Sequence, residues 1–195
     1  MWKDFVLGDG TKEVKKVQIN GKTVFERINE IPFSSSLAPT SWTQVTKNKE
    51  YTASNSYGTW EIITNSVSSS SYAVYLAFDG NASTEWRSAD LGTSGTSYCR
   101  IDTPLLIKPI NIHIIYTAHG TGSYIQGLNP DTNEWENLQV LTKSTSKIDT
   151  NYTITTDKFY SSFRTYSKPY STGSRINHVY EFEITEGYYK TNWGG

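Results

Sequence analysis

Three side chains with hard oxygen atoms lie around one glycine near the middle of the chain. Asn81 follows Asp79 by two positions and Thr84 follows it by five, and Gly80 can take the positive φ that a tight turn needs. Such a turn folds the three oxygens inward, and Ca²⁺ accepts oxygen donors of these kinds in loose geometry. The same residues also fit a plain Asp-Gly turn between two strands, which is a common use of that dipeptide. The spacing alone leaves both interpretations open.

Three short segments, in this order along the chain, share a family pattern. Residues 77–86, AFDGNASTEW, resemble the A-[FI]-D-G-[ND]-x-x-T-x-W signature of discoidin, or coagulation factor 5/8 type C, domains, which include the family-32 carbohydrate-binding modules. Residues 129–135, NPDTNEW, are similar to the S-x-D-G-x-x-W turn of that family, with Asn and Thr replacing Ser and Gly. Residues 179–184, VYEFEI, resemble its terminal A-E-[IL]-x-[VF] strand. The resemblance covers roughly residues 43–188 and implies a galactose-binding-like jelly-roll β-sandwich.

The resemblance also implies a structural calcium site that joins two distant parts of the chain. Its ligands would come from the loop around Gly80 and from the last strand: Leu76, Asp79, Asn81, Thr84, Tyr180 and Glu181. Leu76 and Tyr180 would contribute backbone carbonyls. A metal held by both segments would offset the entropic cost of closing so long a loop. The alternative for Glu181 is a solvated charge on the outward face of its strand.

Sugar sites in this family lie in loops at one end of the sandwich, where an aromatic ring stacks on a pyranose and fixed polar groups meet its hydroxyls. Arg87 stands where family-32 modules often carry His, and the loop that often carries Arg-Asn offers His119 and Tyr124 instead. A further loop contributes Tyr170 and Arg175. These five residues are the candidate ligand-binding set, although the departures from the pattern leave galactose specificity open. The alternative for each residue is surface decoration.

The composition indicates a β-rich protein without a strongly charged partner. Charged residues make up only 19% of the chain, aromatic residues make up 14%, and the net charge is −1. Large aromatic side chains can fill a two-sheet core, while a chain with no basic block is not expected to bind nucleic acid. Cys99 is the only cysteine, so the fold is expected to be stable without an intrachain disulfide. No segment is apolar enough for a signal peptide or a membrane span.

From residue 41 onward, strand-like runs alternate with polar turns at short spacing, which predicts an all-β sandwich. In the segment 110–116, alternate residues Ile110, Ile112, Ile114 and Tyr116 are expected to share one face. In the last strand, Tyr180, Phe182 and Ile184 are expected to face the core, leaving Glu181 and Glu183 outward. No stretch shows a helical period longer than two turns.

The N-terminal part differs from the rest of the chain. Asn20-Gly21 predicts a two-residue hairpin turn, which would pair Val17 with Val24 and Lys15 with Glu26. This segment resembles the hairpins of tail and baseplate proteins from phages of Gram-positive bacteria. We therefore expect an N-terminal docking hairpin over residues 1–31, a Pro- and Ser-rich linker over 32–42, and a discoidin-like domain over 43–190.

Catalysis is not expected, because the three histidines lack metal-site spacing and the chain has no GxSxG or P-loop motif. The sequence predicts a non-catalytic virion protein that binds host cell-wall or capsular polysaccharide and docks on other virion proteins through its hairpin. It would be assembled in the host cytoplasm and exposed outside the cell, and it would not bind membrane; a homo-oligomer is a further option. The alternatives are a decoration or baseplate scaffold that binds no sugar, and a module from a bacterial surface enzyme.

Overall fold

A computed structural model describes residues 16–19, 22–26, 30–90, 95–118, 122–168 and 176–191 of the chain. Strands dominate this part of the chain, and its helices are three short 3₁₀ turns. The elements are β1 (Lys16–Ile19), β2 (Lys22–Glu26), β3 (Ile31–Ser34), η1 (Ser35–Leu37), β4 (Thr43–Thr46), β5 (Glu50–Asn55), β6 (Gly58–Thr64), η2 (Ser70–Tyr72), η3 (Val74–Ala77), β7 (Trp86–Arg87), β8 (Ser97–Ala118), β9 (Ser123–Asn129), β10 (Glu134–Val140), β11 (Ser144–Thr153), β12 (Tyr160–Ser167) and β13 (His178–Thr191). Among the described residues, no helix is long and apolar enough to cross a membrane.

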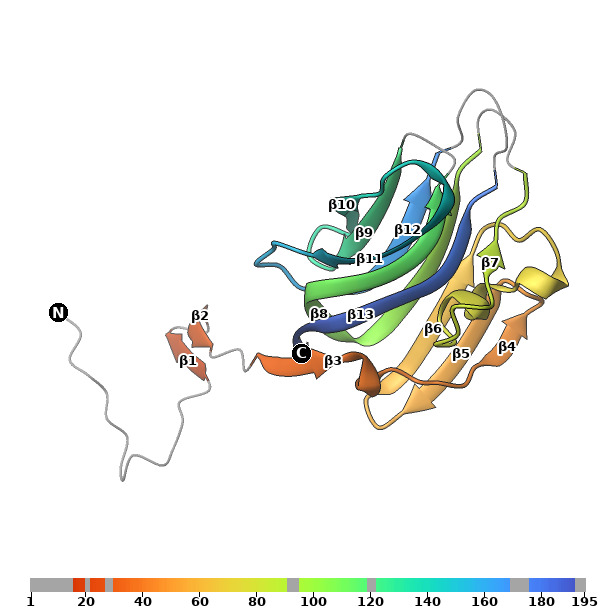
Figure 1. The fold of residues 1–195 in the computed structure, drawn as a ribbon. Coiled ribbons are helices and arrows are strands. Elements are labelled where there is room, and N and C mark those ends of the chain that lie inside the picture. Colours follow the sequence, from red (N-terminus) through yellow and green to blue (C-terminus); the bar gives the residue numbers. More distant parts are fainter. Residues whose placement is uncertain are drawn as a thin grey trace.

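The strands from β3 to β13 form two antiparallel layers that share the long strand β8, and β1 and β2 form a separate two-stranded sheet (Figure 1). The first part of β8 lies in the layer ordered β10-β9-β12-β8-β6-β5-β4, which we call the first layer. The second part of β8 pairs with β11 and β13, and β13 also pairs with β7 and β3, which completes the second layer. This arrangement is the predicted all-β sandwich.

The core lies between the two layers and is filled largely by aromatic and β-branched side chains. Trp60 from the first layer and Trp86 from the second are each 1% exposed. Ile112, Ile114 and Tyr116 are buried on one side of β8, as their alternation predicts, while Ile110 is only partly buried. Because β-branched and aromatic residues suit a pleated, half-buried surface, this composition favours strands that pack face to face.

A bulge in β13 changes which of its side chains are buried. Val179 pairs with Tyr116, but Glu181 pairs with the preceding residue Ile115, so Tyr180 is an extra residue in the ladder. A bulge of this kind interrupts the alternation of side chains along a strand. The prediction that Glu181 faces outward is therefore wrong, because this side chain is 8% exposed.

The N-terminal hairpin is confirmed, but its predicted register is only partly right. Near the turn, Ile19 pairs with Lys22 and Gln18 with Thr23. An irregularity between Val17 and Gln18 then shifts the pairing, so Val17 lies opposite Phe25 rather than Val24. The predicted partner of Glu26, Lys15, lies outside the described residues, and Lys16 pairs with Glu26 instead. One irregular residue thus displaces the outer half of the hairpin.

The segment predicted to be a linker belongs to the sandwich. β3 pairs with β13 through four residue pairs, from Ile31 with Tyr189 to Ser34 with Glu186. Phe33 points into the core and is 4% exposed. Just before β3, Glu30 accepts a hydrogen bond from the Lys108 Nζ at 2.7 Å. The folded domain therefore begins near residue 30, and the predicted linker over 32–42 is wrong for at least its first residues.

Candidate functional site

The loop between η3 and β7 holds the three oxygen-bearing side chains in a tight turn. Gly80 has φ of +70°, as the sequence predicts. Asp79 Oδ1 accepts a hydrogen bond from the Asn81 backbone N–H at 3.0 Å, and its Oδ2 accepts one from the Thr84 Oγ1 at 2.8 Å. Asn81 Oδ1 in turn accepts a hydrogen bond from the Ser83 N–H at 3.1 Å. The loop is thus held in shape by its own polar groups.

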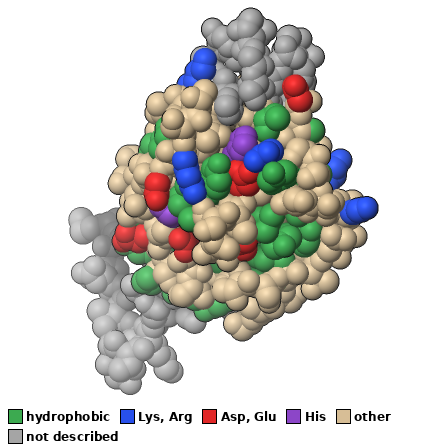
Figure 2. All heavy atoms as spheres, turned by 45° about the vertical axis from the view of Figure 1, so that its right-hand side comes forward, with side chains coloured by type: hydrophobic (Ala, Val, Ile, Leu, Met, Phe, Trp, Pro, Cys, Tyr) green, Lys and Arg blue, Asp and Glu red, His purple; other side chains and the backbone are tan. Residues whose placement is uncertain are grey.

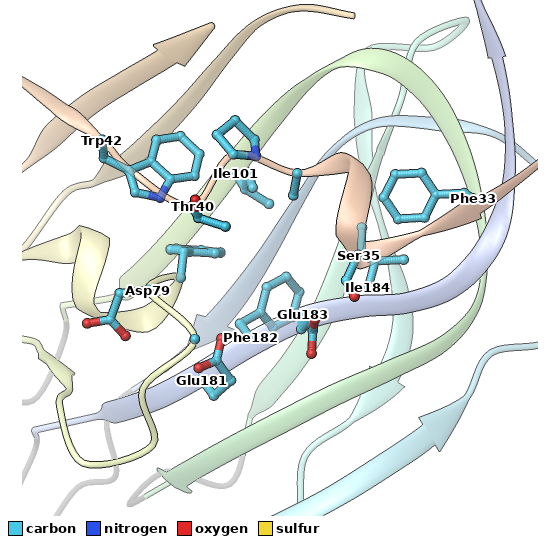
Figure 3. Close-up of a pocket in the computed structure, with 14 residues that line it drawn as sticks. Phe33, Ser35, Thr40, Trp42, Asp79, Ile101, Glu181, Phe182, Glu183 and Ile184 are labelled. Carbon is cyan, nitrogen blue, oxygen red and sulfur yellow. The ribbon is translucent and has the colours of Figure 1, made fainter. Parts of the chain in front are cut away.

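β13 brings a second carboxylate to this loop. Asp79 and Glu181 line the same cavity of about 130 Å³, and Figure 3 shows their side chains on facing elements, the loop and β13. The Gly80 N–H donates a hydrogen bond to the Glu181 carboxylate. Burial raises the pKa of Glu181, and the nearby carboxylates of Glu183 and Asp79 raise it further, to about 7. The structure therefore joins the two segments that the family resemblance would link through a metal.

The carboxylates at this cavity are of a kind that suits Ca²⁺, but of the six predicted ligands only Asp79 and Glu181 line it. In the described part of the chain, no three His, Cys, Asp or Glu side chains gather as a metal site, so the remaining ligands would have to be amide, hydroxyl or carbonyl oxygens. Ca²⁺ accepts such donors together with carboxylates, and the Asp79 carboxylate keeps acceptor capacity beyond its two hydrogen bonds. A cation here would offset the repulsion that raises the pKa of Glu181.

The two residues predicted to contribute carbonyls lie on the elements that flank the loop. Leu76 belongs to η3, where its N–H donates to the Ala73 carbonyl at 3.1 Å. Tyr180 is the extra residue of the β13 bulge, and its ring lies under the Lys147 Nζ at 4.0 Å. Lys147 also donates a hydrogen bond to the Ala82 carbonyl at 2.6 Å. A lysine from β11 thus fastens the loop to the outer side of β13.

Arg87 lies in a polar and aromatic cluster on the second layer, which we call the Arg87 cluster; it comprises Tyr72, Glu85, Arg87, His178 and Tyr180. The Arg87 guanidinium lies over the Tyr72 ring at 3.9 Å from its centre and donates a hydrogen bond to Glu85. The other Glu85 oxygen lies 2.8 Å from the His178 Nδ1. Strand pairing sets this arrangement, because Arg87 in β7 stands opposite His178 in β13.

The electrostatics of the cluster favour a charged Glu85. Burial by itself opposes ionisation of this carboxyl, but hydrogen bonds from His178 and Arg87 outweigh it and hold the pKa of Glu85 below its ordinary value. The Arg87 Nε is buried and has no hydrogen-bond partner among the described residues. The guanidinium is therefore fixed in orientation by one carboxylate and one ring, while its side chain remains 30% exposed.

The structure does not bring together the two predicted ligand-binding residues that it describes. Arg87 belongs to the second layer. Tyr124 lies in β9 of the first layer, where it is partly exposed between the buried residues Ser123 and Ile125. Its cross-strand neighbours are Tyr166 and Val140, which also belong to the first layer. The other candidates, His119, Tyr170 and Arg175, lie outside the described residues.

The sequence interpretation missed most members of the Arg87 cluster. Glu85 could have been found, because residues two apart in an extended segment share a face and Trp86 between Glu85 and Arg87 is a natural core residue. His178 and Tyr72 reach Arg87 only through the pairing of β7 with β13 and the placement of η2. No local pattern indicates those contacts. In Figure 2, Lys, Arg, Asp, Glu and His side chains are interspersed on one face of the molecule rather than gathered by sign.

Comparisons with known proteins support the fold. No family model and no curated protein matches the chain. Among solved structures, the chain is similar to chitosan-binding module 1 of a chitosanase/glucanase from Paenibacillus sp. IK-5, with a TM-score of 0.51, 17% identity, and coverage of 65% of this chain and 92% of that one. It is also similar to the family 32 CBM of C. perfringens NanJ in complex with galactose, with a TM-score of 0.50, 13% identity, and coverage of 72% and 99%.

A third similar structure is an f-lectin from the serum of the striped bass, Morone saxatilis, with a TM-score of 0.53 and 13% identity. The match covers 69% of this chain and 48% of the lectin. At these identities the comparisons establish the fold, a discoidin-like β-sandwich, and leave its ligand to be inferred from the site itself.

Proposed function

We propose that this chain is a non-catalytic carbohydrate-binding module whose sugar site includes the Arg87 cluster. The single observation that carries the proposal is the Arg87 guanidinium, which lies over the Tyr72 ring at 3.9 Å from its centre and is hydrogen-bonded to Glu85. Carbohydrate sites combine an aromatic surface with a few polar groups held in fixed orientation, and a guanidinium has planar N–H donors beyond those that Glu85 uses. Two of the similar solved structures are a chitosan-binding module and a module in complex with galactose, which favours the same class of ligand here.

The position of the cluster supports a site at one end of the sandwich. His178 begins β13 and pairs with both Arg87 and Thr117, one residue before the end of β8. The candidate loop residue His119 follows β8 directly in sequence, and Arg175 precedes β13 by three positions. We therefore assign Arg87 to the sugar site together with these two loop residues, and we assign Tyr124 to a different surface.

A structural Ca²⁺ is part of the proposal. The Asp79 and Glu181 carboxylates would hold the ion together with oxygens of Leu76, Asn81, Thr84 and Tyr180. When bound, it would supply positive charge between the buried Glu181 carboxylate and the partly buried Asp79 carboxylate, and it would link the loop to β13. A bound ion would also help to hold the Arg87 cluster in position, because Tyr180 and Glu85 share a hydrogen bond and both lie next to the metal-binding segments.

The biological setting that we propose is a phage virion that adheres to the cell-wall polysaccharide of a Gram-positive host. The N-terminal hairpin supports this setting, since β1 and β2 form a two-stranded sheet of their own that pairs with no strand of the sandwich. A hairpin by itself is marginally stable, so it would gain stability by docking on another virion protein. Many copies on one particle would convert weak sugar binding into strong adhesion.

The test is binding of the full chain to a glycan array and to purified wall polysaccharide, in calcium and in EDTA. Arg87→Gln removes the guanidinium donors, and hydrogen bonds to charged groups contribute about 1.5–3 kcal/mol, so affinity should fall by about tenfold or more. Lys47→Gln makes the same change of charge on an exposed turn and should leave binding unchanged. Melting temperatures show whether each variant is folded.

The outcomes separate the candidate functions. Wild-type protein that binds no glycan and no wall fraction, even as a multimer, would favour a structural scaffold. Binding that is unchanged in a folded Arg87→Gln variant would move the sugar site away from the Arg87 cluster.

A further inference from the structure

The outer face of the first layer carries a second group of aromatic and planar polar side chains, which we call the sheet-face patch. It comprises Tyr98, Tyr124, Gln126, Trp135, Arg164 and Tyr166, from strands β8, β9, β10 and β12. These residues alternate along their strands with core residues such as Cys99, Ile125 and Phe163, which are fully buried. The patch therefore faces away from the core, and it shares no residue with the Arg87 cluster.

Three tyrosines form a row across adjacent strands. Tyr166 in β12 stands directly opposite Tyr98 in β8 on one side and opposite Tyr124 in β9 on the other. All three side chains are partly exposed. Neighbouring strands lie about 4.8 Å apart, so the row spans about 10 Å. A surface of this length and chemistry can stack against consecutive rings of a sugar chain.

Arg164 lies two residues before Tyr166 in β12, so the two side chains share one face of the sheet. Its guanidinium lies 3.9 Å from the centre of the Trp135 ring and 4.8 Å from that of Tyr166, and its Nε donates a hydrogen bond to the Gln126 Oε1 at 2.7 Å. The Gln126 Nε2 donates in turn to the Asn137 Oδ1 at 2.8 Å. The guanidinium is thus held in place by neutral groups.

The charge of Arg164 is not neutralised within the described part of the chain, where it forms no ion pair. Arg100 stands directly opposite Arg164 on β8 but is paired with Asp102 at 2.6 Å. On the other side of β8, strand β6 carries the Glu61 carboxylate, which stands opposite Asp102. Like charges opposite one another on adjacent strands are unfavourable, and burial together with Arg100 lowers the pKa of Arg164. An anion at Arg164 would relieve this unfavourable arrangement.

Polar atoms without partners lie beside the same residues. Arg100 Nε and Asp102 Oδ1 are buried and make no hydrogen bond with any residue that the structure describes. Buried polar groups are nearly always satisfied in native proteins, so this side of the patch has hydrogen-bonding capacity that its own side chains leave unused.

We propose that the sheet-face patch is a second binding surface, for an acidic polysaccharide. The tyrosine row would stack against sugar rings, and Arg164 would pair with a carboxylate or phosphate group of the chain. Planar guanidinium groups are well suited to such anions because they form two parallel hydrogen bonds. This surface would act in addition to the Arg87 cluster and uses none of its residues.

A polysaccharide fits the patch better than a folded protein does. The buried centre of a protein–protein interface is also rich in aromatic and arginine side chains, but it is depleted in Asp and Glu and is more apolar than its rim. Here the centre is an arginine bonded to a glutamine, with a second arginine and an aspartate beside it. Leu128 and the 62% exposed Val140 are the apolar side chains nearest to this centre along β9 and β10. Fixed polar groups between aromatic rings suit a ligand covered with hydroxyl groups.

The experiment is affinity electrophoresis of the full chain in gels that contain one of three polymers. Polygalacturonate presents carboxylates, glycerol-phosphate teichoic acid presents phosphates, and dextran is neutral. We expect retardation by one or both acidic polymers but not by dextran, and weaker retardation at high salt. The two acidic polymers distinguish the source of the anion.

Variants locate the binding surface. Arg164→Gln should lower affinity for the acidic polymer by about tenfold or more, because a charge-assisted hydrogen bond is lost. Arg164→Lys keeps the charge without the planar donors and should lose affinity to a smaller extent. Tyr166→Ala should cost up to about tenfold through the lost ring contact. Melting temperatures confirm folding, and Arg164→Lys together with Tyr166→Ala carries the test if Arg164→Gln does not fold.

Two controls separate this proposal from the function assigned to the Arg87 cluster. Lys47→Gln removes the same charge next to β4, at the opposite edge of the first layer, and should not change retardation. Arg164→Gln should leave binding of neutral glycans on the array intact, because the sheet-face patch shares no residue with the Arg87 cluster. Equal retardation by dextran, no retardation by either acidic polymer, or unchanged binding in folded Arg164 variants would overturn the proposal.

Discussion

Phe33 should be essential to the stability of the sandwich, although it lies in a segment that reads as a linker. The side chain is 4% exposed and packs in the main core cluster, and Figure 3 shows it beside Ile184 of β13. Replacing a buried phenylalanine by alanine costs about 3–5 kcal/mol, because apolar contacts are lost and a cavity remains. For a domain of this size, that loss lowers the melting temperature by roughly 10 °C.

The assay is urea unfolding followed by tryptophan fluorescence, together with thermal melts. Ile31→Ala is the matched control, because Ile31 lies in the same strand but is 39% exposed; its free energy of unfolding should change little. Two truncations extend the test. Deletion of residues 1–29 removes the separate hairpin and should leave the melting temperature unchanged, whereas deletion of 1–36 also removes β3 and its pairing with β13.

Equal melting temperatures of the two truncations, together with a cost below about 1 kcal/mol for Phe33→Ala, the scale of a surface substitution, would refute this role of Phe33. In that case residues 31–37 would contribute little to the fold, and the linker interpretation would be right after all.

Three further predictions concern the metal, the thiol and acid pH. In scanning calorimetry, EDTA should lower the melting temperature of the wild type, by an amount equivalent to about 2.7 kcal/mol if free calcium was a hundredfold above its dissociation constant. Asp79→Asn or Glu181→Gln should remove this difference, and a wild type whose melting temperature does not change in EDTA would count against the metal site. Burial raises the pKa of Cys99 to about 12, so a thiol reagent should label it only as fast as the protein unfolds, and immediate labelling of native protein would contradict its burial. Hydrogen bonds from Asn129 and then Lys158 lower the pKa of Glu136 from 4.5 to about 2, so this residue contributes stability above pH 4.5 that is lost as the pH falls toward 2. Glu136→Gln should therefore make the free energy of unfolding less dependent on pH over that range, and an unchanged pH dependence would show that the contribution is absent.

The sequence predicts the fold class well because its strongest signals are local. Alternation predicts the inward face of β8 at Ile112 and Ile114, and both residues are fully buried. The glycine and its flanking oxygens predict the turn around Gly80, which has the expected positive φ. Each of these features depends on residues a few positions apart, whose geometry is set by backbone sterics and side-chain period.

The errors and omissions have a different physical origin. A bulge at Tyr180 buries Glu181, and strand alternation cannot reveal where a bulge occurs. Pro and Ser residues made the segment around Phe33 resemble a linker, whereas pairing with β13 makes it a strand. The separation of Tyr124 from Arg87 follows from the assignment of β9 and β7 to different layers, and long-range pairing of this kind leaves no trace in a single sequence.

The long strand β8 has a consequence for how the chain folds as it is synthesised. Its second part pairs with β13, which begins 60 positions after β8 ends, from residue 118 to residue 178. Contacts so distant in sequence make folding slow, on the scale of milliseconds to seconds for all-β domains. Until β13 leaves the ribosome, the backbone N–H and C=O groups along one edge of β8 have no partner strand, and an unpaired edge of this kind is a template for aggregation. Newly made chains should therefore depend on chaperones, or on a low expression temperature, during the interval before the last strand closes the second layer.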